Sequence, residues 1–476
     1  MKKFSKAFWV ANSVELLERL AYYAVFIVLT IYLSNVWGFT DVQSGIISGV
    51  FSAFLYLLPT FVGAYADKIG FRSSILIAFA LLTIGYFGLG IAPTFFENAG
   101  LVKYGAGTGD GLFSAFFQER GLVTFGHDTE FMGLKNSAQQ WIIIPILLLI
   151  VIGGAFIKSV ISGTVARETT EATRARGFAI FYMMVNIGAF TGKTVVDPLR
   201  KSLGDLGLVY LNYFSASMTL LALIAVFFFY QSSNTTGQNK SFSDIFKALG
   251  KVCTNGRLII LILIVSGFWM VQQQMYATMP KYVIRLVGQD ASPGWIANVN
   301  PFCVFLLVNL VTSLMQKRSA LASMTVGMFI IPISALIMAT GSMMNTDLIF
   351  GTIHPVTLML IIGIAFQALA ECFISPRFLE YFSLQSPKGE EGLYLGFSHL
   401  HSFVSSILAF GLSGFLLERY CPDPKDFTPE AYVQATAHAH YIWFFFFGIG
   451  LVSAIALVIY GKVTRKMDAE KIPSEI

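Results

Sequence analysis

Long apolar runs recur from one end of this 476-residue chain to the other, and they limit the folds open to it. A membrane-crossing helix needs about 20 mostly apolar residues, and the chain holds twelve such runs. The runs lack the strict alternation of a membrane β-barrel, whereas helices satisfy their own backbone hydrogen bonds in lipid. We therefore expect an all-α membrane protein with twelve transmembrane helices. The predicted spans are residues 14–36, 41–66, 73–93, 140–163, 177–195, 206–230, 257–280, 294–315, 320–342, 355–381, 391–417 and 437–461.

The composition excludes several other classes of protein. Charged residues make up 12% of the chain, where soluble domains average about 25%. A disordered chain, a disulfide-rich secreted fold and a nucleic-acid binder are therefore excluded, in spite of the net charge of +5. The four cysteines are scattered without a CxxC pair or zinc spacing, so we expect neither a metal nor a cofactor.

The placement of lysine and arginine predicts the orientation. With the amino terminus inside, cytoplasmic segments hold 19 of these residues and the opposite side holds 10, Lys193, Lys281 and Arg285 among them. The first apolar run carries charges and lacks a small-residue cleavage site, so we interpret it as a retained span. We expect a multi-pass protein of the cytoplasmic (inner) membrane with both termini in the cytoplasm.

A polar loop in the middle of the chain divides the predicted spans into six and six. We predict an N-terminal six-helix bundle at residues 1–230, a cytoplasmic linker at 231–256 and a C-terminal six-helix bundle at 257–476. An extracytoplasmic insertion is predicted at 93–140. Two helical halves with a site between them are typical of secondary transporters.

The first span carries charges on one face. Glu15, Glu18, Arg19, Tyr22 and Tyr23 are spaced i, i+3, i+4, i+7 and i+8, which places them along one stripe of a helix. Glu15 and Arg19 form an i,i+4 pair, and Glu18 on the same face needs another cation. The alternative is a cytoplasmic helix end with solvated charges.

Two further charges lie within predicted spans. Lys158 is preceded by a long apolar stretch and is about nine residues from the cytoplasmic end of its span, which is deep for a snorkelling lysine. Glu371 follows about sixteen residues without formal charge, and its alternative is a structural pair with a base on another helix. Such residues usually face a cavity or a partner. A site with a basic wall and an acidic residue suits a zwitterion, and the carboxylates beside cations form a plausible proton relay.

Several motifs resemble one known family. ELLERLAYY (Glu15–Tyr23) resembles the ExxERFxYY signature of the proton-dependent oligopeptide transporters, a branch of the major facilitator superfamily. GAYADKIGFR (Gly63–Arg72) is similar to the superfamily's GxxxDRxGxR loop. IGGAFIKSVIS resembles GxGxxKPNxS, FAIFYMMVNIGAF resembles FYxxINxG, and FWMVQQQ resembles FWxxxEQQ. The matches, which also include VNPFCVFLL and ECFISPRFLEYFSLQSPKG, run in order from residue 15 to about 396, so they cover both halves.

The resemblance implies a major facilitator fold and a role for each matching residue. Glu15, Glu18 and Arg19 would couple transport to protons, with Lys158 as the partner base. Arg19 and Lys158 would attract a peptide carboxylate, and Asn300 with Glu371 would hold its amino group. Asp67 and Arg72 would control opening of the cytoplasmic side. The remaining residues of the predicted substrate site are Tyr22, Tyr23, Tyr56, Asn186 and Gln273.

The chain also departs from the family pattern. Phe26 stands where the family usually has a second arginine, and Gln273 stands at an acidic position. Ser159 follows Lys158 in place of proline, and Ser398 occupies the usual tryptophan position. The middle loop is too short for the two extra helices that many bacterial members carry, which is consistent with twelve spans.

Three functions follow from these patterns. The leading hypothesis is a proton-coupled symporter that imports di- and tripeptides, with short peptides, protons and lipid as partners, no nucleic acid, and a monomeric chain. The second is a transporter of the same fold for another small anion or zwitterion, such as an amino-acid conjugate or a nitrate-like anion, which the Phe26 and Gln273 departures favour. The third is a membrane enzyme or receptor, for which the sequence offers no nucleophile constellation.

Overall fold

A computed structural model of the chain describes residues 4–107, 109, 111–125, 128–169, 173–231, 243, 246–247, 250, 254–344, 349, 352–384 and 397–470. Within these ranges the side chains of residues 60, 63–65, 67–68, 159, 166, 174–175, 179, 382–384 and 467–470 are not described. Contacts divide the chain into two compact units. Unit 1 contains residues 1–245 and 276–298, and unit 2 contains residues 246–275 and 299–476. The predicted linker at 231–256 lies largely outside the described residues, and the predicted domain boundaries stay predictions.

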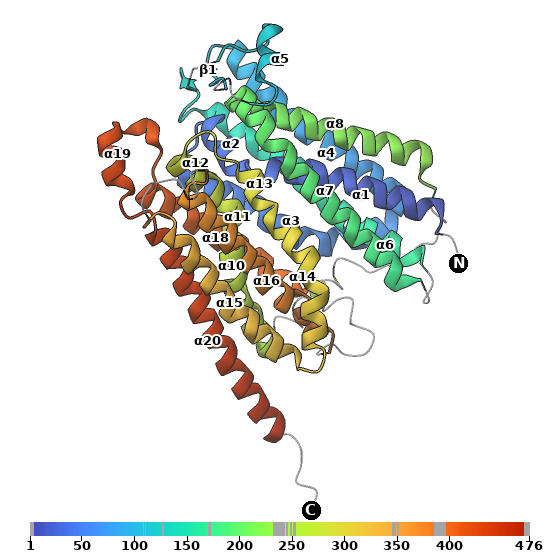
Figure 1. The fold of residues 1–476 in the computed structure, drawn as a ribbon. Helices are drawn as coiled ribbons and strands as arrows, with labels where there is room; N and C mark the ends of the chain where they lie inside the picture. The colour runs from blue at the N-terminus through green and yellow to red at the C-terminus, as the bar shows by residue number, and fades with distance from the viewer. Residues whose placement is uncertain are drawn as a thin grey trace, which may run out of the picture. The chain divides into compact units, whose positions relative to one another are not determined.

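The described residues form helices of membrane-spanning length (Figure 1). Eleven helices are long and apolar enough to cross a membrane, or twelve when the bent pair α1 and α2 is taken as one span. The helices of unit 1 are α1 (Lys6–Phe26), α2 (Leu29–Asn35), α3 (Asp41–Ile69), α4 (Phe71–Asn98), α5 (Ser114–Glu119), α6 (Ile143–Arg167), α7 (Arg174–Leu203), α8 (Asp205–Phe229), α12 (Met279–Val287) and α13 (Pro293–Ala297). Those of unit 2 are α10 (Gly256–Gln272), α14 (Val299–Met315), α15 (Ala320–Thr340), α16 (Pro355–Leu384), α18 (Leu400–Tyr420), α19 (Pro429–Thr436) and α20 (Tyr441–Glu470), and α11 (Gln274–Ala277) crosses the boundary between the units.

The first span begins earlier than the predicted residue 14. Helix α1 starts at Lys6 because the Ser5 hydroxyl caps it, accepting a hydrogen bond from the Phe8 backbone N–H at 3.1 Å. A 47° bend at residues 27–28 separates α1 from α2. The charges of the first span therefore lie in the third and fourth turns of a buried helix, away from its N-terminal end.

Unit 1 is held together by helix pairs that include α1 with α7 and α8, α4 with α6 and α8, and α3 with α6. Two glycines of α7 allow it to approach the backbone of α1. A Cβ atom at Gly188 would lie 2.6 Å from the Leu16 carbonyl oxygen, and one at Gly192 would lie 2.4 Å from the Leu20 carbonyl oxygen. Small residues at this spacing are a general means of close helix packing in membranes.

We expect Gly192→Ala to destabilise unit 1 by about 1–3 kcal/mol, because the added methyl group would overpack a contact with backbone. The measurement is the midpoint of thermal unfolding of the purified protein in detergent. The matched control is Gly461→Ala on α20, where an added Cβ meets nothing within 4 Å. Equal midpoints for the two variants would contradict the close contact between α1 and α7.

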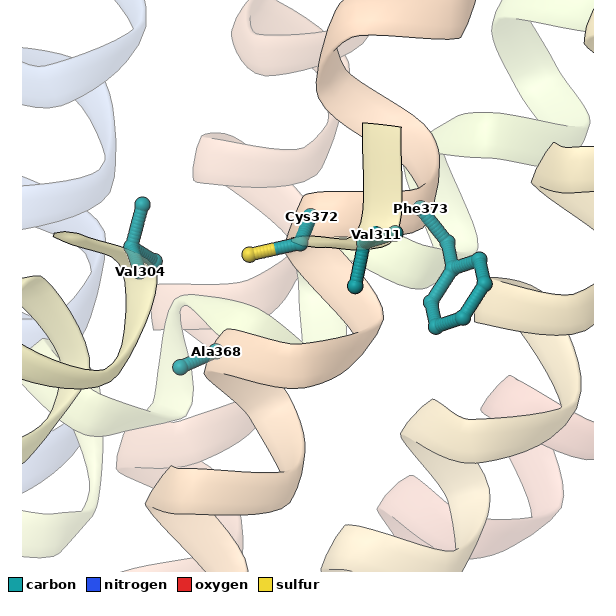
Figure 2. Close-up of a cluster of buried hydrophobic side chains, with 5 residues drawn as sticks. All are labelled: Val304, Val311, Ala368, Cys372 and Phe373. Carbon is teal, nitrogen blue, oxygen red and sulfur yellow. The ribbon is translucent and has the colours of Figure 1, made fainter. Parts of the chain in front are cut away.

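Unit 2 packs around α15 and α16, and α15 also contacts α20. Helix α14 lies beside α16, with a small apolar cluster between them (Figure 2). Helix α10 packs against α18 and α20. The cluster contains Val304, Val311, Ala368, Cys372 and Phe373. On α14 the polar residue Asn300 lies four residues before Val304, and on α16 Glu371 lies in sequence between Ala368 and Cys372.

The segment between α4 and α6 is a compact loop beside the start of α8. Helix α4 continues to Asn98, beyond the predicted end of its span at residue 93, and the loop includes a short antiparallel pair, β1 (Val102–Lys103) and β2 (Glu130–Phe131). The Thr129 hydroxyl hydrogen-bonds to Asp205 on α8 at 2.5 Å and accepts from the Gly105 N–H at 2.8 Å. The η1 turn (Ala138–Ile142) then leads into α6.

Candidate functional site

Three ionisable side chains of α1 form a buried ionic triad. The Arg19 Nε atom lies 2.7 Å from Glu15 Oε1 and 3.1 Å from Glu18 Oε2. The exposed fractions are 2% for Glu15, 4% for Glu18 and 8% for Arg19, so none of the three is a solvated helix end. Charges so deep in a membrane span are costly and are kept where they have partners and a function.

The two carboxylates are not held equally. Arg19 donates a hydrogen bond to Glu15 through Nε. Arg19 and Glu18 form an ion pair, but the contact does not have the geometry of a hydrogen bond. Glu18 Oε2 has no hydrogen-bond partner among the described residues. Glu18 is therefore the carboxylate of the triad that is less firmly fixed, and a proton can be added to it with the loss of fewer contacts.

Lys158 on α6 belongs to the same region of unit 1. Its ammonium group donates to the Leu55 carbonyl oxygen at 3.1 Å and lies 4.1 Å from the centroid of the Tyr56 ring on α3. Its charge also interacts with those of Glu18 and Arg19. The lysine is thus held inside the unit by a carbonyl group and an aromatic face.

Aromatic residues continue the stripe of α1 beyond the triad. Tyr22 stacks on Phe26 at a centroid distance of 5.0 Å and meets Tyr23 edge-on at 5.1 Å. Tyr22 is buried, whereas Tyr23 is half-buried. On α7 the Asn186 amide donates to the Tyr182 carbonyl oxygen of its own helix at 2.8 Å, so one of its amide hydrogens is already used locally.

A buried lysine that the sequence analysis assigned to the outer side lies within this unit. Lys193 on α7 is 1% exposed, and its ammonium group lies over the rings of Tyr23, at 5.1 Å, and Tyr276, at 5.3 Å. The signal that could have found it is its place inside the predicted span 177–195. Helix α7 continues to Leu203, eight residues beyond that prediction, so Lys193 lies inside the helix and not in a loop.

Unit 2 holds a carboxylate between two amides. Glu371 Oε2 accepts hydrogen bonds from Gln272 Nε2 at 3.0 Å and from Asn300 Nδ2 at 3.2 Å. The structure thus brings the predicted residues Asn300 and Glu371 together. Gln273, the predicted site residue, donates instead to Ser405 and Ser406 on α18, at 3.2 and 3.0 Å. Its neighbour Gln272, which is not among the predicted site residues, contacts Glu371 in its place.

The motif between α3 and α4 is described only in part. Arg72 donates from Nη2 to the Phe227 carbonyl oxygen near the end of α8, at 2.9 Å. Asp67 lies on α3, and its side chain lies outside the described residues. The gating role predicted for the two residues stays a prediction.

A second ionic cluster ties the segment 276–298 to the rest of unit 1. Asp41 at the start of α3 binds Lys281 at 2.6 Å and Arg285 at 2.6 Å, and Lys281 also donates to Ser34. All three charged side chains are largely buried. Arg200 on α7 donates to the Gln289 carbonyl oxygen at 2.8 Å. Sequence spacing could not reveal these contacts, because they join residues more than 80 positions apart.

Comparison with solved structures identifies the fold. The chain matches a structure from a study of substrate recognition in proton-dependent oligopeptide transporters, with a TM-score of 0.69 and 17% identity, over 98% of this chain and 99% of that chain. Together with the membrane-spanning helices, this likeness defines a membrane protein with the major facilitator fold. The predicted fold class is confirmed.

Sequence comparison then finds similarity to one family. A sequence model of the POT family matches residues 255–424. Dipeptide and tripeptide permease B of Shigella dysenteriae is 26% identical over 446 residues, covering 86% of each chain. The permease B of Aeromonas hydrophila is 26% identical over 438 residues, covering 85% of this chain and 83% of that protein. The chain is thus similar to transporters of the POT family, the family that the first-span and fifth-span motifs resemble, and its relatives are named as peptide permeases.

Proposed function

We propose that this protein is a proton-coupled symporter that imports di- and tripeptides. The observation that carries the proposal is the buried triad of Glu15, Glu18 and Arg19, because two carboxylates on one cation inside a membrane span provide a site for a transported proton. The relatives named as dipeptide and tripeptide permeases favour a peptide over the other small anions and zwitterions considered.

The proton would be carried by Glu18. Its contact with Arg19 lacks a hydrogen bond, and the charge of Lys158 also acts on it. Glu15 accepts a hydrogen bond directly from Arg19, so its carboxylate is held on this cation. Protonation of Glu18 would leave Arg19 and Lys158 with less compensating charge. The two cations would then attract an anionic group of the substrate more strongly, which links proton uptake to substrate binding.

The substrate would be bound by its two charged ends. Arg19 and Lys158 would attract the peptide carboxylate, and Glu371, held by Asn300, would bind the amino group. A buried charge requires a partner of opposite charge, so this arrangement selects a zwitterion. The other residues proposed to contact the substrate are Tyr22, Tyr23, Tyr56, Asn186 and Gln273.

Gating, topology and assembly complete the proposal. Asp67 and Arg72 would hold the cytoplasmic side closed, a role supported by the bond from Arg72 to the end of α8. The chain would cross the cytoplasmic membrane with both termini in the cytoplasm, and it would work as a monomer. The excess of lysine and arginine in the predicted cytoplasmic segments supports this orientation.

Uptake of radiolabelled peptides into proteoliposomes tests the proposed function. An inwardly directed proton gradient should drive accumulation of dipeptides and tripeptides above the external concentration, and a protonophore should abolish it. The same vesicles are tested with nitrate and with an N-acylated amino acid. Accumulation of either of these, with no uptake of any peptide, would contradict the proposal and support the anion alternative.

A further inference from the structure

Lys193 is a buried cation for which the family resemblance provides no role. It lies on α7 and is 1% exposed, among the largest fully buried side chains of the described residues. Ionisable groups inside membrane spans are rare because they are costly, and they mark functional sites by default. The surroundings of its ammonium group indicate which kind of ligand it could bind.

The ammonium group lies in an aromatic cluster at the level of Phe26. It is 5.1 Å from the Tyr23 ring centroid and 5.3 Å from that of Tyr276, and the Tyr276 ring is 5.0 Å from that of Phe26. Arg19, Tyr23 and Phe26 are spaced i, i+4 and i+7 on α1, so they follow one another along one face. Lys193 therefore brings a positive charge to the turns of α1 that follow the triad.

The crossing of α7 and α1 explains how the lysine reaches this position. Gly192 precedes Lys193 and lies against the Leu20 carbonyl oxygen, where a larger residue would not fit. The backbone of α7 is thereby held at the level of Leu20 of α1. The four-carbon side chain of Lys193 then extends past α1 to the half-buried rings of Tyr23 and Tyr276.

We propose that Lys193 is a specificity residue that binds the C-terminal carboxylate of the substrate peptide, supplying from α7 the charge that Phe26 does not supply from α1. This inference rests on the proposed function. Aromatic faces attract an ammonium group more weakly than a carboxylate does when both are desolvated. A peptide carboxylate arriving at Tyr23 would therefore draw the flexible side chain of Lys193 away from the rings, and it would bind Lys193 in addition to Arg19 and Lys158.

Binding of dialanine and of dialanine amide to the purified protein, measured without a proton gradient, tests the inference. The wild type should prefer dialanine, because only this probe carries the carboxylate. Lys193→Gln should lose roughly tenfold or more in affinity for dialanine, the value of one hydrogen bond to a charged group, with the affinity for the amide unchanged. Adding Phe26→Arg to Lys193→Gln should restore the preference. Lys201→Gln, which removes a charge farther along α7, is the matched control and should behave as the wild type.

Each other outcome overturns a stated part of the account. Equal loss of both probes in Lys193→Gln would mean that Lys193 only packs against Tyr276, and an unchanged preference would mean that it does not meet the carboxylate. Lys193→Met, which keeps an unbranched side chain, replaces Lys193→Gln if thermal unfolding shows that the glutamine variant does not fold. A wild type that binds neither probe would refute the proposed function itself, and the inference with it.

Discussion

Replacing Glu18 with glutamine should abolish peptide accumulation driven by a proton gradient and leave exchange of peptide for peptide intact. Glutamine keeps the size of the side chain but cannot take up or release a proton. Exchange requires no net proton movement, so it should continue near the wild-type rate. Accumulation should fall to simple equilibration, with equal peptide concentrations inside and outside. Both quantities can be measured in the same proteoliposomes, with and without an imposed pH gradient.

The control for this experiment is a carboxylate outside the triad. Glu380 on α16 is paired with Arg377 at 2.7 Å, and its side chain is 44% exposed. Glu380→Gln should therefore accumulate peptide as the wild type does. If Glu18→Gln still accumulates peptide against its gradient, Glu18 is not the proton site, and the difference between its contact with Arg19 and that of Glu15 has no functional meaning.

Replacing Glu371 with glutamine should weaken binding of peptides with a free amino terminus by about 10- to 100-fold, and spare N-acetylated peptides. This loss of affinity corresponds to the free energy of one hydrogen bond to a charged group. The bond is lost when the carboxylate becomes a neutral amide. An N-acetylated peptide has no ammonium group, so it loses nothing. Affinities are measured by binding without a gradient, which separates this effect from proton coupling.

The amides around Glu371 provide a matched variant. Gln272→Leu removes one hydrogen bond to Glu371 Oε2 and leaves the carboxylate charge in place. It should reduce affinity for the free peptide less than Glu371→Gln does. A Glu371→Gln variant that loses free and N-acetylated peptides equally would contradict recognition of the amino terminus, and would assign Glu371 to the structure of unit 2.

The spans could be predicted from the sequence because each is a long apolar run, but their interruptions could not. The predicted span 257–280 is divided in the structure into α10, α11 and the beginning of α12. The run QQQ at residues 272–274 gives no breaking signal, since glutamine is a good helix former. The predicted start of the eleventh span at residue 391 lies outside the described residues, and α18 begins at Leu400.

The site was predictable where its residues share one helix. The spacing of Glu15, Glu18 and Arg19 determines that they meet, because residues three and four apart are neighbours on a helix. Contacts between different helices could not be predicted from the spacing of residues in the sequence. The bond from Gln272 to Glu371 joins residues 99 positions apart, and the position of Lys193 over Tyr23 depends on the close packing at Gly192.

The most direct test of the central claim is whether peptide carries protons with it. Proteoliposomes containing the wild-type protein and a trapped pH-sensitive dye are prepared with equal pH on both sides, and the membrane potential is clamped with potassium and valinomycin. Adding dialanine outside should acidify the lumen, and Glu18→Gln should remove the acidification. Uptake of dialanine without any change in lumenal pH would contradict the proposed proton coupling.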